Sequence, residues 1–409
     1  MTKEKIIAGL DIGTSKVCCV IGSKTNDGTF NILSCAFAKN DCVKKGVVVN
    51  LKGLSDVISR VIYKAESEAD TKINSVYVNV MDANIEGIKS RGEVVISDRD
   101  SEITRYNVRK ADDNARSISI PYEREILHYI HYGYTIDGEK GIADPSGMFG
   151  IKLESDLYLI TTKAAMFENL KKAIRQSGTG IAAAVVSSIP TSMALLSKHE
   201  KQIGTALVDI GADLTEVSIY TEGLMRYLKV MTIGGNNVTN QISAKLNLSE
   251  SAAESLKLES GILDREFTDD DKLILNVDSR KRVVRKKELQ AVLQESYKKM
   301  FADIKEAAYK SHIFRDASNG VVLTGGSSML EGAAEMAEIE FGCPVRIGHI
   351  TELANMPRSM SGHIFATATG LVKYGFKEIE KRKDVIRKGP KNAISSAVDY
   401  IRRLYREYF

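Results

Sequence analysis

The feature that most constrains the fold is a repeat, because two segments in different halves of the chain follow the same plan. Residues 8–20 and 207–220 each contain an apolar run, an Asp-Ile-Gly triplet with a short polar turn, and a second apolar run. Two β-rich runs joined by a short turn that contains glycine predict a β-hairpin. Because the 409-residue chain carries one copy in each half, we expect two similar domains that face each other.

The turn of the first copy, from Asp11 to Lys16, has the composition of a phosphate-binding loop. Gly13 lets backbone N–H groups approach an anion closely. Thr14 and Ser15 add hydroxyl donors, and Lys16 adds a positive charge. Asp11 has the wrong sign to touch phosphate, which points to a hydrated Mg²⁺ between the two. For a single copy, an ordinary hairpin with a polar turn is the alternative interpretation.

The second copy strengthens the phosphate interpretation, because two facing turns could hold the phosphates of one nucleotide between them. Asp209 corresponds to Asp11 in the repeat. We therefore expect the hydrated Mg²⁺ to lie near both carboxylates. The candidate cofactor-binding residues of this copy are Asp209, Gly211, Ala212, Asp213 and Thr215.

A strand that runs into a glycine-rich turn is the third motif. The apolar run 321–324 leads into the turn, and a helix is expected from about Glu331. A loop that carries a nucleoside at a helix N-terminus has this form. The candidate residues of this turn are Gly325, Gly326, Ser327 and Met329.

Two further candidates lie between the second and third motifs. Gly234 and Gly235 form a turn into an expected helix over 238–246. Glu254 and Lys257 lie three residues apart on the next expected helix, 249–258, and so share a face. On spacing alone, the second pair is a surface ion pair of little energetic value.

The bulk composition is that of a soluble globular protein, with 43% hydrophobic and 27% charged residues. The length predicts two to four folding units. Five cysteines without the spacing of metal ligands indicate small buried side chains in a reducing cytosol. No apolar run is long enough for a membrane span, and the first residues do not have the pattern of a signal peptide.

The positive charge is concentrated at the end of the chain. The whole chain has a net charge of +4, and residues 377–409 contain ten Lys and Arg against five Asp and Glu. This segment alone carries +5, so the remaining residues carry −1. A nearly neutral body argues against nucleic-acid binding, and the basic segment predicts a partner of its own.

The last residues predict a membrane-binding helix. Residues 377–390 are a charge-rich connector, a composition that is usually solvated. Residues 391–409 follow the i, i+3/i+4 spacing of a helix with one apolar face and a basic face. The apolar positions are Ile394, Val398, Ile401, Leu404, Tyr405, Tyr408 and Phe409, and the basic ones are Arg402, Arg403 and Arg406. Such a helix is typical of an interfacial anchor on anionic lipid, and a helix that packs on protein is the alternative.

The rest of the chain alternates expected strands and helices. Residues 82–155 contain more tyrosine and charged residues than the segments around them. This segment predicts a small inserted α/β unit. The segment 223–233 predicts a pair of strands. The main expected helices are 51–69, 101–117, 165–176, 286–311 and 361–374.

The three motifs in this order, together with the tail, resemble one family: FtsA, the actin-like bacterial division protein that tethers FtsZ filaments to the membrane. Asp11–Lys16 resembles its first phosphate motif, Asp209–Glu216 its second, and Gly325–Met329 its adenosine motif. Actin-like ATPases in general share these motifs. The insertion at 82–161 and the terminal amphipathic helix are more particular to FtsA.

The resemblance implies an α/β fold of duplicated actin-like (ribonuclease H-like) domains around a cleft for ATP and Mg²⁺, with an inserted small α/β subdomain and a C-terminal amphipathic helix. Glu254 and Lys257 lie where related ATPases contact the ribose and adenine. The implied divisions are 1–81 with 162–191 and 358–376 for the first half, 82–161 for the insert, 192–225 with 304–357 for the second half, 226–303 for a smaller subdomain, 377–390 for a linker and 391–409 for the membrane helix.

The resemblance also implies a function. The protein would polymerise into protofilaments at the cytoplasmic face of the bacterial plasma membrane, at the division site, and recruit later division proteins. It would anchor FtsZ by docking the FtsZ C-terminal tail on residues 226–303. Two positions depart from the family: Gln241 stands where an aspartate is usual, and Ser296 where an arginine is frequent.

Any ATPase activity is expected to be weak, because no carboxylate must be a general base. Asp213 and Glu216 are the candidates for positioning a water molecule. Two other functions stay open from the sequence. A small-molecule kinase of the same superfamily would have no use for a basic amphipathic tail, and an ATP-binding scaffold of the pilus-assembly type would pack its last helix on a protein.

Overall fold

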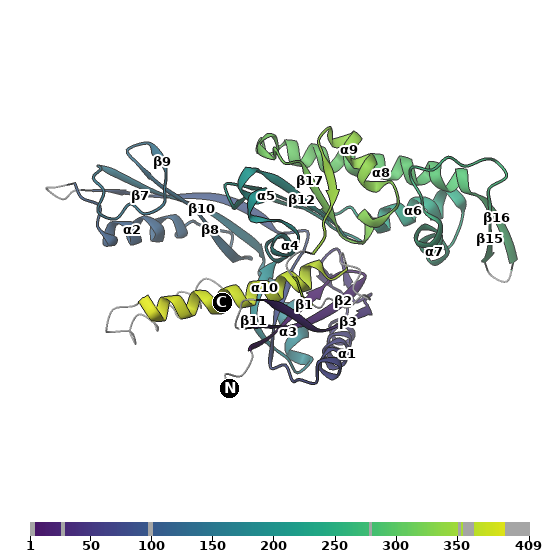
Figure 1. Ribbon diagram of the computed structural model, residues 1–409, viewed down its shortest axis with the longest axis horizontal. Helices are drawn as coiled ribbons and strands as arrows, with labels where there is room; N and C mark the ends of the chain where they lie inside the picture. Colours follow the sequence, from purple (N-terminus) through teal and green to yellow (C-terminus); the bar gives the residue numbers. More distant parts are fainter. Residues whose placement is uncertain are drawn as a thin grey trace.

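The computed structural model describes residues 5–25, 29–96, 101–277, 280–350, 353–354 and 364–388, with two lobes and a third unit that extends from them (Figure 1). The first lobe has a six-stranded sheet in the order β11-β6-β1-β2-β3-β19. Its strands are β1 (Lys5–Ile12), β2 (Lys16–Lys24), β3 (Phe30–Lys39), β6 (Ser75–Val80), β11 (Gly180–Val186) and β19 (Leu353–Ala354). A two-stranded sheet of β4 (Val43–Lys44) and β5 (Val47–Val48) lies between β3 and the first helix in the sequence.

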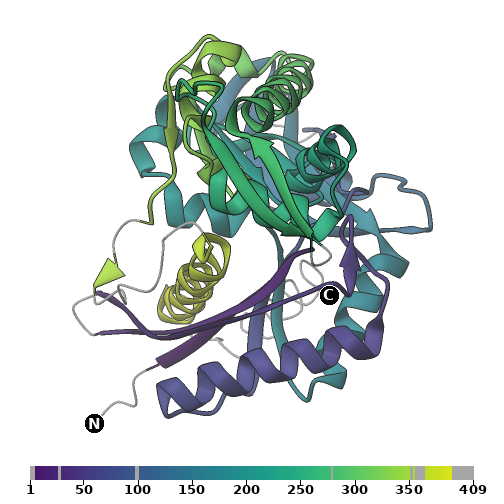
Figure 2. The ribbon, with the colours of Figure 1, turned by 90° about the vertical axis from the view of Figure 1, so that its right-hand side faces the viewer.

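Helices cover both faces of the first-lobe sheet (Figure 2). On one face lie α1 (Leu51–Ala69) and α3 (Ala164–Gln176), and on the other lies α10 (Ala366–Lys388). Side chains of a strand alternate between faces, so Leu10 enters the core under α1 whereas Ile7 packs with α10. The predicted helix 51–69 is confirmed, and the side chain of Asn50 caps it by accepting a hydrogen bond from the N–H of Gly53.

The second lobe and the third unit share one nine-stranded sheet, in the order β18-β17-β12-β13-β14-β7-β10-β8-β9. The second-lobe strands are β12 (Thr205–Ile210), β13 (Thr215–Thr221), β14 (Leu224–Met231), β17 (Val321–Thr324) and β18 (Val345–Ile347). Its helices are α5 (Lys198–Ile203), α6 (Gly235–Leu246), α7 (Glu250–Ser260), α8 (Lys286–Tyr309), α9 (Ala333–Phe341) and the short η1 (Phe314–Asp316) and η2 (Gly326–Met329). A hairpin of β15 (Lys272–Val277) and β16 (Arg280–Arg285) projects beyond α7 (Figure 1).

The third unit is the predicted insertion. Its strands are β7 (Glu86–Val95), β8 (Arg124–Ile136), β9 (Glu139–Ile142) and β10 (Lys152–Lys163), and α2 (Arg105–Arg116) packs on this sheet. One residue pair, Lys229 with Glu86, joins β14 to β7. Two tyrosines reinforce the junction, because the hydroxyl of Tyr132 donates to the carbonyl of Met225 at 2.8 Å and the N–H of Leu228 donates to Tyr158 Oη at 3.1 Å.

Helix α10 is the element that both lobes share. It packs on β1 and on α4 (Ser188–Leu195), with the Thr191 and Thr367 hydroxyls 2.9 Å apart. A Cβ at Gly370 would lie 1.9 Å from the carbonyl oxygen of Pro190, so the two helix backbones are in direct contact there. Small residues permit such close approach, and any added atom has no space to occupy.

Two sequence predictions are wrong. Residues 223–233 do not form a strand pair; one strand, β14, follows a tight turn in which Glu222 and Gly223 adopt φ of 53° and 78°. The glycine therefore belongs to the β13–β14 turn and not to a turn inside the segment. Helix α10 also continues past the expected end at Tyr374 as far as Lys388, because no glycine or proline follows Gly375 before Gly389.

The linker prediction for 377–390 thus falls largely on helix, since α10 includes residues 377–388. The predicted membrane helix, 391–409, and residues 361–363 of the predicted helix 361–374 lie outside the described residues. The division into domains stays a prediction. Within the described part of the chain, no helix combines the length and the apolarity that a membrane span requires.

The α4–α10 contact yields a stability prediction. Glycine-to-alanine substitution in a helix usually stabilises it by about 0.5–1 kcal/mol. We expect Gly370→Ala to lower the free energy of unfolding by about 1–3 kcal/mol instead, because the new methyl meets backbone atoms of Pro190 that cannot move aside.

Urea denaturation measures this effect. Gly326→Ala is the matched control, since no atom lies within 4 Å of its added Cβ. Equal stability of the Gly370→Ala variant and the unmodified protein would contradict the close contact.

Candidate functional site

The two predicted hairpins are confirmed, and their tips have the same geometry. The N–H of Gly13 donates to the carbonyl of Lys16, and the N–H of Gly211 donates to that of Leu214, each at 2.9 Å. Within the described chain, no acceptor lies in hydrogen-bond range of the N–H groups at positions 14 and 15, or at 212 and 213. Each tip therefore presents two adjacent backbone donors, which is the arrangement of an anion-binding nest.

At the first tip, Asp11 is held by two partners. Asn79 Nδ2 donates to Asp11 Oδ1 at 2.7 Å, while Asn79 Oδ1 accepts from the N–H of Ile12 at 2.7 Å. The thiol of Cys18, directly opposite on β2, lies 3.7 Å from Asp11 Oδ2. Burial raises the pKa of Asp11, and the charge of Lys16 lowers it. The carboxylate is thus oriented and desolvated, so a cation beside it would be strongly favoured.

Lys16 binds to the segment that starts α10. Its ammonium donates to the carbonyl of Ile364 at 2.8 Å, two residues before the helix begins. The side chain is partly buried and extends from the same turn as Thr14 and Ser15. The first tip therefore combines hydroxyl, amide and ammonium donors in a few residues.

At the second tip, Asp209 faces a desolvated and negative environment. Burial and the charge of Asp11 raise the pKa of Asp209 to about 6, and Lys16 acts in the opposite direction. Since Asp209 lies on β12 and Asp11 on β1, the effect of Asp11 on Asp209 indicates that the hairpins of the two lobes approach each other. Two carboxylates with one lysine leave unbalanced negative charge, which a hydrated divalent cation would neutralise.

The environments of the two candidate catalytic residues differ. Glu216 lies opposite Asp209 on β13 and is 1% exposed, and burial together with Asp209 raises its pKa well above the ordinary value. A carboxyl group enclosed in this way is poorly placed to take a proton from a water molecule as a general base. Asp213 has both carboxylate oxygens engaged: Oδ1 accepts from Asn236 Nδ2 at 2.7 Å, and Oδ2 accepts from the N–H of Lys45 at 3.0 Å.

The Lys45 contact connects the lobes. Lys45 lies at the tip of the β4–β5 hairpin, where Lys45 and Gly46 have φ of 49° and 77°. Both residues are in the left-handed region that a two-residue hairpin turn requires. The turn thereby directs a backbone N–H at the second phosphate-type turn. The sequence analysis did not identify Asn79 or Lys45 as site residues. The one signal that could have found Asn79 is its polar side chain within the otherwise apolar strand 75–80.

The glycine turns pack against the second tip. The N–H of Gly235 donates to the carbonyl of Gly211 at 3.0 Å, and a Cβ at Gly234 would lie 2.6 Å from that carbonyl oxygen. Gly325, with φ of 86°, leaves no space for a Cβ, which would lie 2.5 Å from Asp209 Oδ1. Ser327 Oγ donates to the carbonyl of Gly211 at 3.2 Å. These predicted turns thus meet at one place, at the second tip.

Glu254 and Lys257 are part of a buried network and not of a surface pair. Lys257 is 7% exposed, and its ammonium contacts Glu254 Oε2 at 2.7 Å, Thr239 Oγ1 at 2.7 Å and the carbonyl of Gly235 at 3.0 Å. Thr215 Oγ1 donates to the carbonyl of Ile233 at 2.8 Å and ties β13 to the same turn. Met329 is 46% exposed at the end of η2.

Comparisons with known proteins decide the family. A family model described as "SHS2 domain inserted in FTSA" matches residues 83–161, and one described as "Cell division protein FtsA" matches residues 206–370. A relative with that second description from Pseudomonas aeruginosa is 32% identical over 93% of this chain and 91% of its own. The chain belongs to the FtsA family. The Escherichia coli FtsA is 29% identical, with 93% and 94% of the two chains covered.

Solved structures show the FtsA chain to have an actin-like fold. A PilM-PilN type IV pilus biogenesis complex contains a chain with a TM-score of 0.64 and 17% identity, over 90% of this chain and 98% of that one. MreB5 of Spiroplasma citri bound to AMPPNP has a TM-score of 0.56 and 12% identity, over 93% and 99%. The predicted α/β fold with an inserted subdomain is thereby confirmed.

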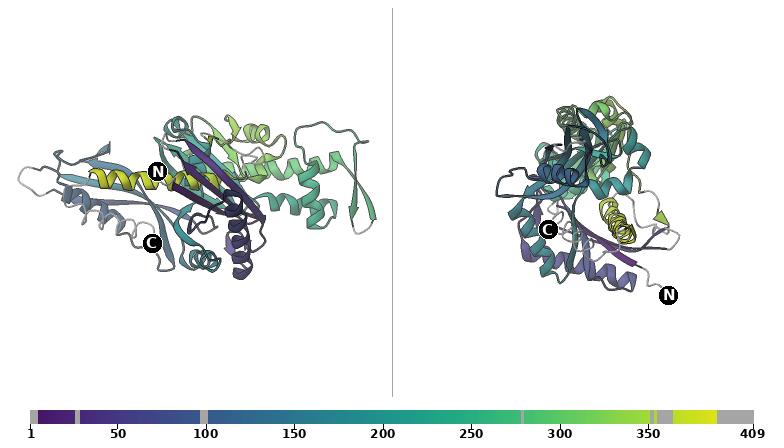
Figure 3. Two further views of the ribbon diagram at one scale, coloured as in Figure 1. Left: turned by 60° about the horizontal axis from the view of Figure 1, so that its bottom comes forward. Right: turned by 90° about the vertical axis from the view of Figure 1, so that its left-hand side faces the viewer.

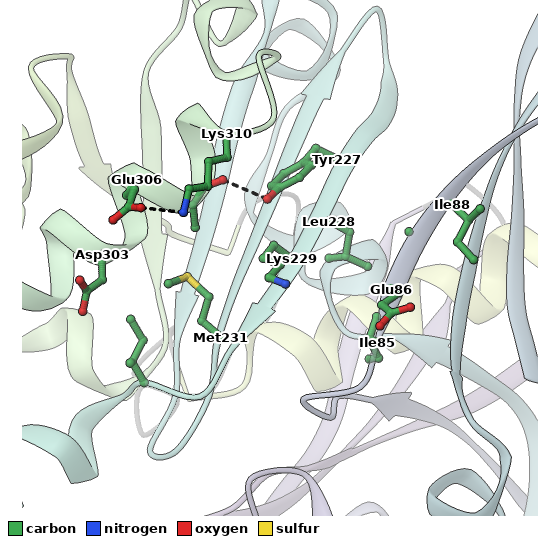
Figure 4. A pocket seen from close by; sticks show the side chains of 13 residues that line it. Ile85, Glu86, Ile88, Tyr227, Leu228, Lys229, Met231, Asp303, Glu306 and Lys310 are labelled. Carbon is green, nitrogen blue, oxygen red and sulfur yellow. Dashed lines mark hydrogen bonds and ion pairs between the residues drawn. The ribbon is translucent and has the colours of Figure 1, made fainter. Parts of the chain in front are cut away.

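A cavity that the structure presents lies away from the hairpin tips. It has a volume of about 730 Å³ and lies between β7, β14 and α8 (Figure 4). Glu86, Lys229, Asp303, Glu306 and Lys310 bring charges of both signs to it, and Glu306 pairs with Lys310. The cavity opens where β7 and β14 move apart on leaving Lys229 and Glu86, the one residue pair that joins the two strands. Its lining includes none of the residues of the three predicted motifs.

The raised pKa of Asp209 predicts a dependence of stability on pH. Between about pH 4 and pH 6 the folded protein holds a proton on Asp209 that the unfolded chain releases, so its stability falls as the pH rises through this range. We expect Asp209→Asn to remove this fall and, at pH 7.5 without nucleotide, to raise the free energy of unfolding by on the order of 2 kcal/mol.

Denaturant titrations at pH 5 and pH 7.5 test this expectation, with the exposed Asp56→Asn as the control. An unchanged pH dependence in Asp209→Asn would show that Asp209 is not strained by burial and by Asp11.

Proposed function

We propose that this FtsA-family protein binds ATP with Mg²⁺ between its lobes and serves as a membrane-attached, polymerising adaptor in cell division. The observation that carries the proposal is the pair of facing hairpin tips. Each presents two adjacent backbone donors, and a desolvated aspartate lies at the base of each. Donors for an anion together with carboxylates for a cation are the two halves of a site for a metal–phosphate complex.

The residues divide by chemistry. Thr14, Ser15 and Lys16 would hold phosphate oxygens through hydroxyl and ammonium donors, and the backbone at 212 and 213 would do so from the other lobe. Asp11 and Asp209 would hold the hydrated Mg²⁺. A water-mediated metal fits the donor set, because among the described residues no three His, Cys, Asp or Glu side chains meet at one point as direct ligands.

The nucleoside would lie where the turns of the second lobe meet. Gly235, Ser327 and Lys257 border this place, and Glu254 reaches it from α7. MreB5, which shares the fold, was solved bound to AMPPNP, which supports a nucleotide in this cleft. Neither Asp213, engaged across the lobes, nor Glu216, buried opposite Asp209, is well placed as a base. Slow hydrolysis or none is therefore the expected chemistry.

The proposed adaptor role requires a docking site for FtsZ and self-association into filaments. The subdomain 226–303 exposes the apolar side chains of Leu258 and Ile274, 71% and 67% exposed, and this is where an FtsZ C-terminal tail would dock. Ser296, where the family often has arginine, donates its hydroxyl to the carbonyl of Val292 in its own helix and is not directed at a partner. Filament-forming relatives of the fold, such as MamK, support self-association into protofilaments.

The role of Lys16 in ATP binding is directly testable. We expect Lys16→Ala to weaken ATP affinity by about tenfold or more, because it removes one charge-assisted hydrogen bond to phosphate. Isothermal titration calorimetry with Mg·ATP measures the affinity. The exposed Lys52→Ala on α1 serves as the control, and equal affinity of the two variants would overturn the phosphate assignment of the first tip.

The membrane role depends on residues 391–409. We expect a chain truncated after residue 390 to lose co-sedimentation with vesicles of 30% phosphatidylglycerol, because the apolar face and its arginines supply the affinity. A full-length Leu404→Asp variant, which keeps the length and interrupts the apolar face, should behave in the same way. Undiminished pelleting of the truncated chain would remove the anchor from the proposal.

A further inference from the structure

A cluster of lysines lies away from the nucleotide site, where α5 meets the second half of α10. Lys198 and Lys201 come from α5, and Lys373, Lys377 and Lys381 come from α10. The electrostatic effects of Lys373 and Lys377 on Lys201, and of Lys198 and Lys381 on Lys377, show that the five ammonium groups are neighbours. We call these five residues the lysine cluster.

The spacing on α10 places its three lysines in one row. Lys373, Lys377 and Lys381 follow one another at intervals of four residues, so they lie on one face of the helix. Like charges at this spacing destabilise a helix. The row begins where α10 packs on the first-lobe sheet and on α4, and it continues toward the end of the helix. That end of α10 extends toward the side of the insert (Figures 1 and 3).

Two members of the cluster are held in place by the body. Lys201 is half-buried, with its ammonium 5.4 Å from the centre of the Tyr220 ring on β13, and Lys373 Nζ lies 3.5 Å from the carbonyl of Met193 on α4. Lys201 and Lys373 are thus fixed against the body, whereas Lys198, Lys377 and Lys381 are exposed to solvent. The positively charged surface is therefore preorganised for a partner.

The acidic residues nearby offset the charge of the cluster only in part. Glu200 binds the guanidinium of Arg346 and caps α5 through the N–H of Ser197. Glu378 pairs with Lys381 at 2.8 Å. Burial and then the charges of Lys377 and Lys373 lower the pKa of Lys201 to about 8, and burial and Lys381 lower that of Lys377. The repulsion that remains would be relieved by an anion.

We propose that the lysine cluster is a second membrane contact, a surface on the folded body that binds the anionic headgroups of the bilayer. This inference rests on the proposed function, in which the tail places the protein at the membrane. The position of the cluster supplies the choice of partner. Residue 391 follows Lys388 by three residues, so the chain can separate the start of the predicted membrane helix from the end of α10 by at most about 11 Å. From Lys381 to Lys388 the helix adds only about 10 Å.

If both the tail and the lysine cluster contact the membrane, the orientation of the body relative to the bilayer is fixed. A tail alone leaves the body free to rotate above the bilayer, whereas headgroups bound along the lysine row fix the direction of α10. Because α10 starts at the segment whose Ile364 carbonyl binds Lys16, the oriented helix would also relate the nucleotide cleft to the membrane plane. Protofilaments in which all subunits carry the same orientation require such a constraint.

The test uses the full-length chain with its tail intact. In the cluster variant Lys198, Lys377 and Lys381 are replaced together by glutamine. In the matched control the exposed Lys52, Lys64 and Lys172, on α1 and α3, are replaced in the same way. Binding to vesicles of 30% phosphatidylglycerol in phosphatidylcholine is measured by flotation at 150 mM salt, alongside vesicles of phosphatidylcholine alone.

We expect the cluster variant to bind the anionic vesicles at least tenfold more weakly, since each lysine near the surface contributes about fivefold. The control should stay within about twofold of the unmodified protein, because its lysines lie on another face. Both variants should bind Mg·ATP normally, which shows that they are folded. Equal binding by the cluster variant and the control would overturn the proposal, whereas failure of the tail itself is seen separately in the truncated chain.

Two further results would also contradict a headgroup site. If inorganic phosphate abolished vesicle binding at constant ionic strength, the cluster would be a site for free phosphate. If the cluster variant lost the same affinity for neutral vesicles, its effect would not be electrostatic recognition of lipid.

Discussion

The arrangement of this molecule depends on the approach of two carboxylates, Asp11 and Asp209, each at the base of a hairpin tip. They come from different lobes, and the burial of Asp209 together with the charge of Asp11 raises the pKa of Asp209 to about 6. Two acids that face each other in a cleft favour an open or protonated state until a cation arrives. In the proposed function, the energy of that approach would be coupled to the closure of the lobes, and Mg·ATP would favour the closed state.

Helix α10 is the element through which a change in the cleft could reach the rest of the protein. It begins two residues after the carbonyl that binds Lys16, and it contacts α4 so closely that a methyl group at Gly370 has no space. It ends at Lys388, close in sequence to the proposed membrane helix. The contact with Lys16, the contact with α4 and the end nearest the proposed membrane helix thus lie along one rigid element. A rigid helix transmits a displacement better than the solvated connector that the sequence predicted for residues 377–390, which include the second half of α10.

Much of the fold was predictable because it is local. The hairpins at 8–20 and 207–220 follow from alternating apolar runs and a glycine turn, and α1 from its apolar spacing between Leu51 and Ala69. The errors also have local causes. Gly223 was assigned to the wrong turn, since a glycine marks a turn without saying which strands it joins. The charged residues 377–388 were predicted as a linker, although Glu378–Lys381 pairing and the packing of the preceding turns continue the helix.

The sequence by itself determined the composition of the site: the repeated Asp-Ile-Gly turns, the glycine loops and the basic tail, all of which are properties of neighbouring residues. Only the tertiary structure decided which groups meet. It directed the backbone N–H of Lys45 at Asp213, placed Asn79 beside Asp11, buried Glu216, and assembled five lysines from two helices whose lysines lie more than 170 residues apart in the sequence. The reason is physical: the strength of a charge or a hydrogen bond depends on distance and solvent access, and long-range folding sets both.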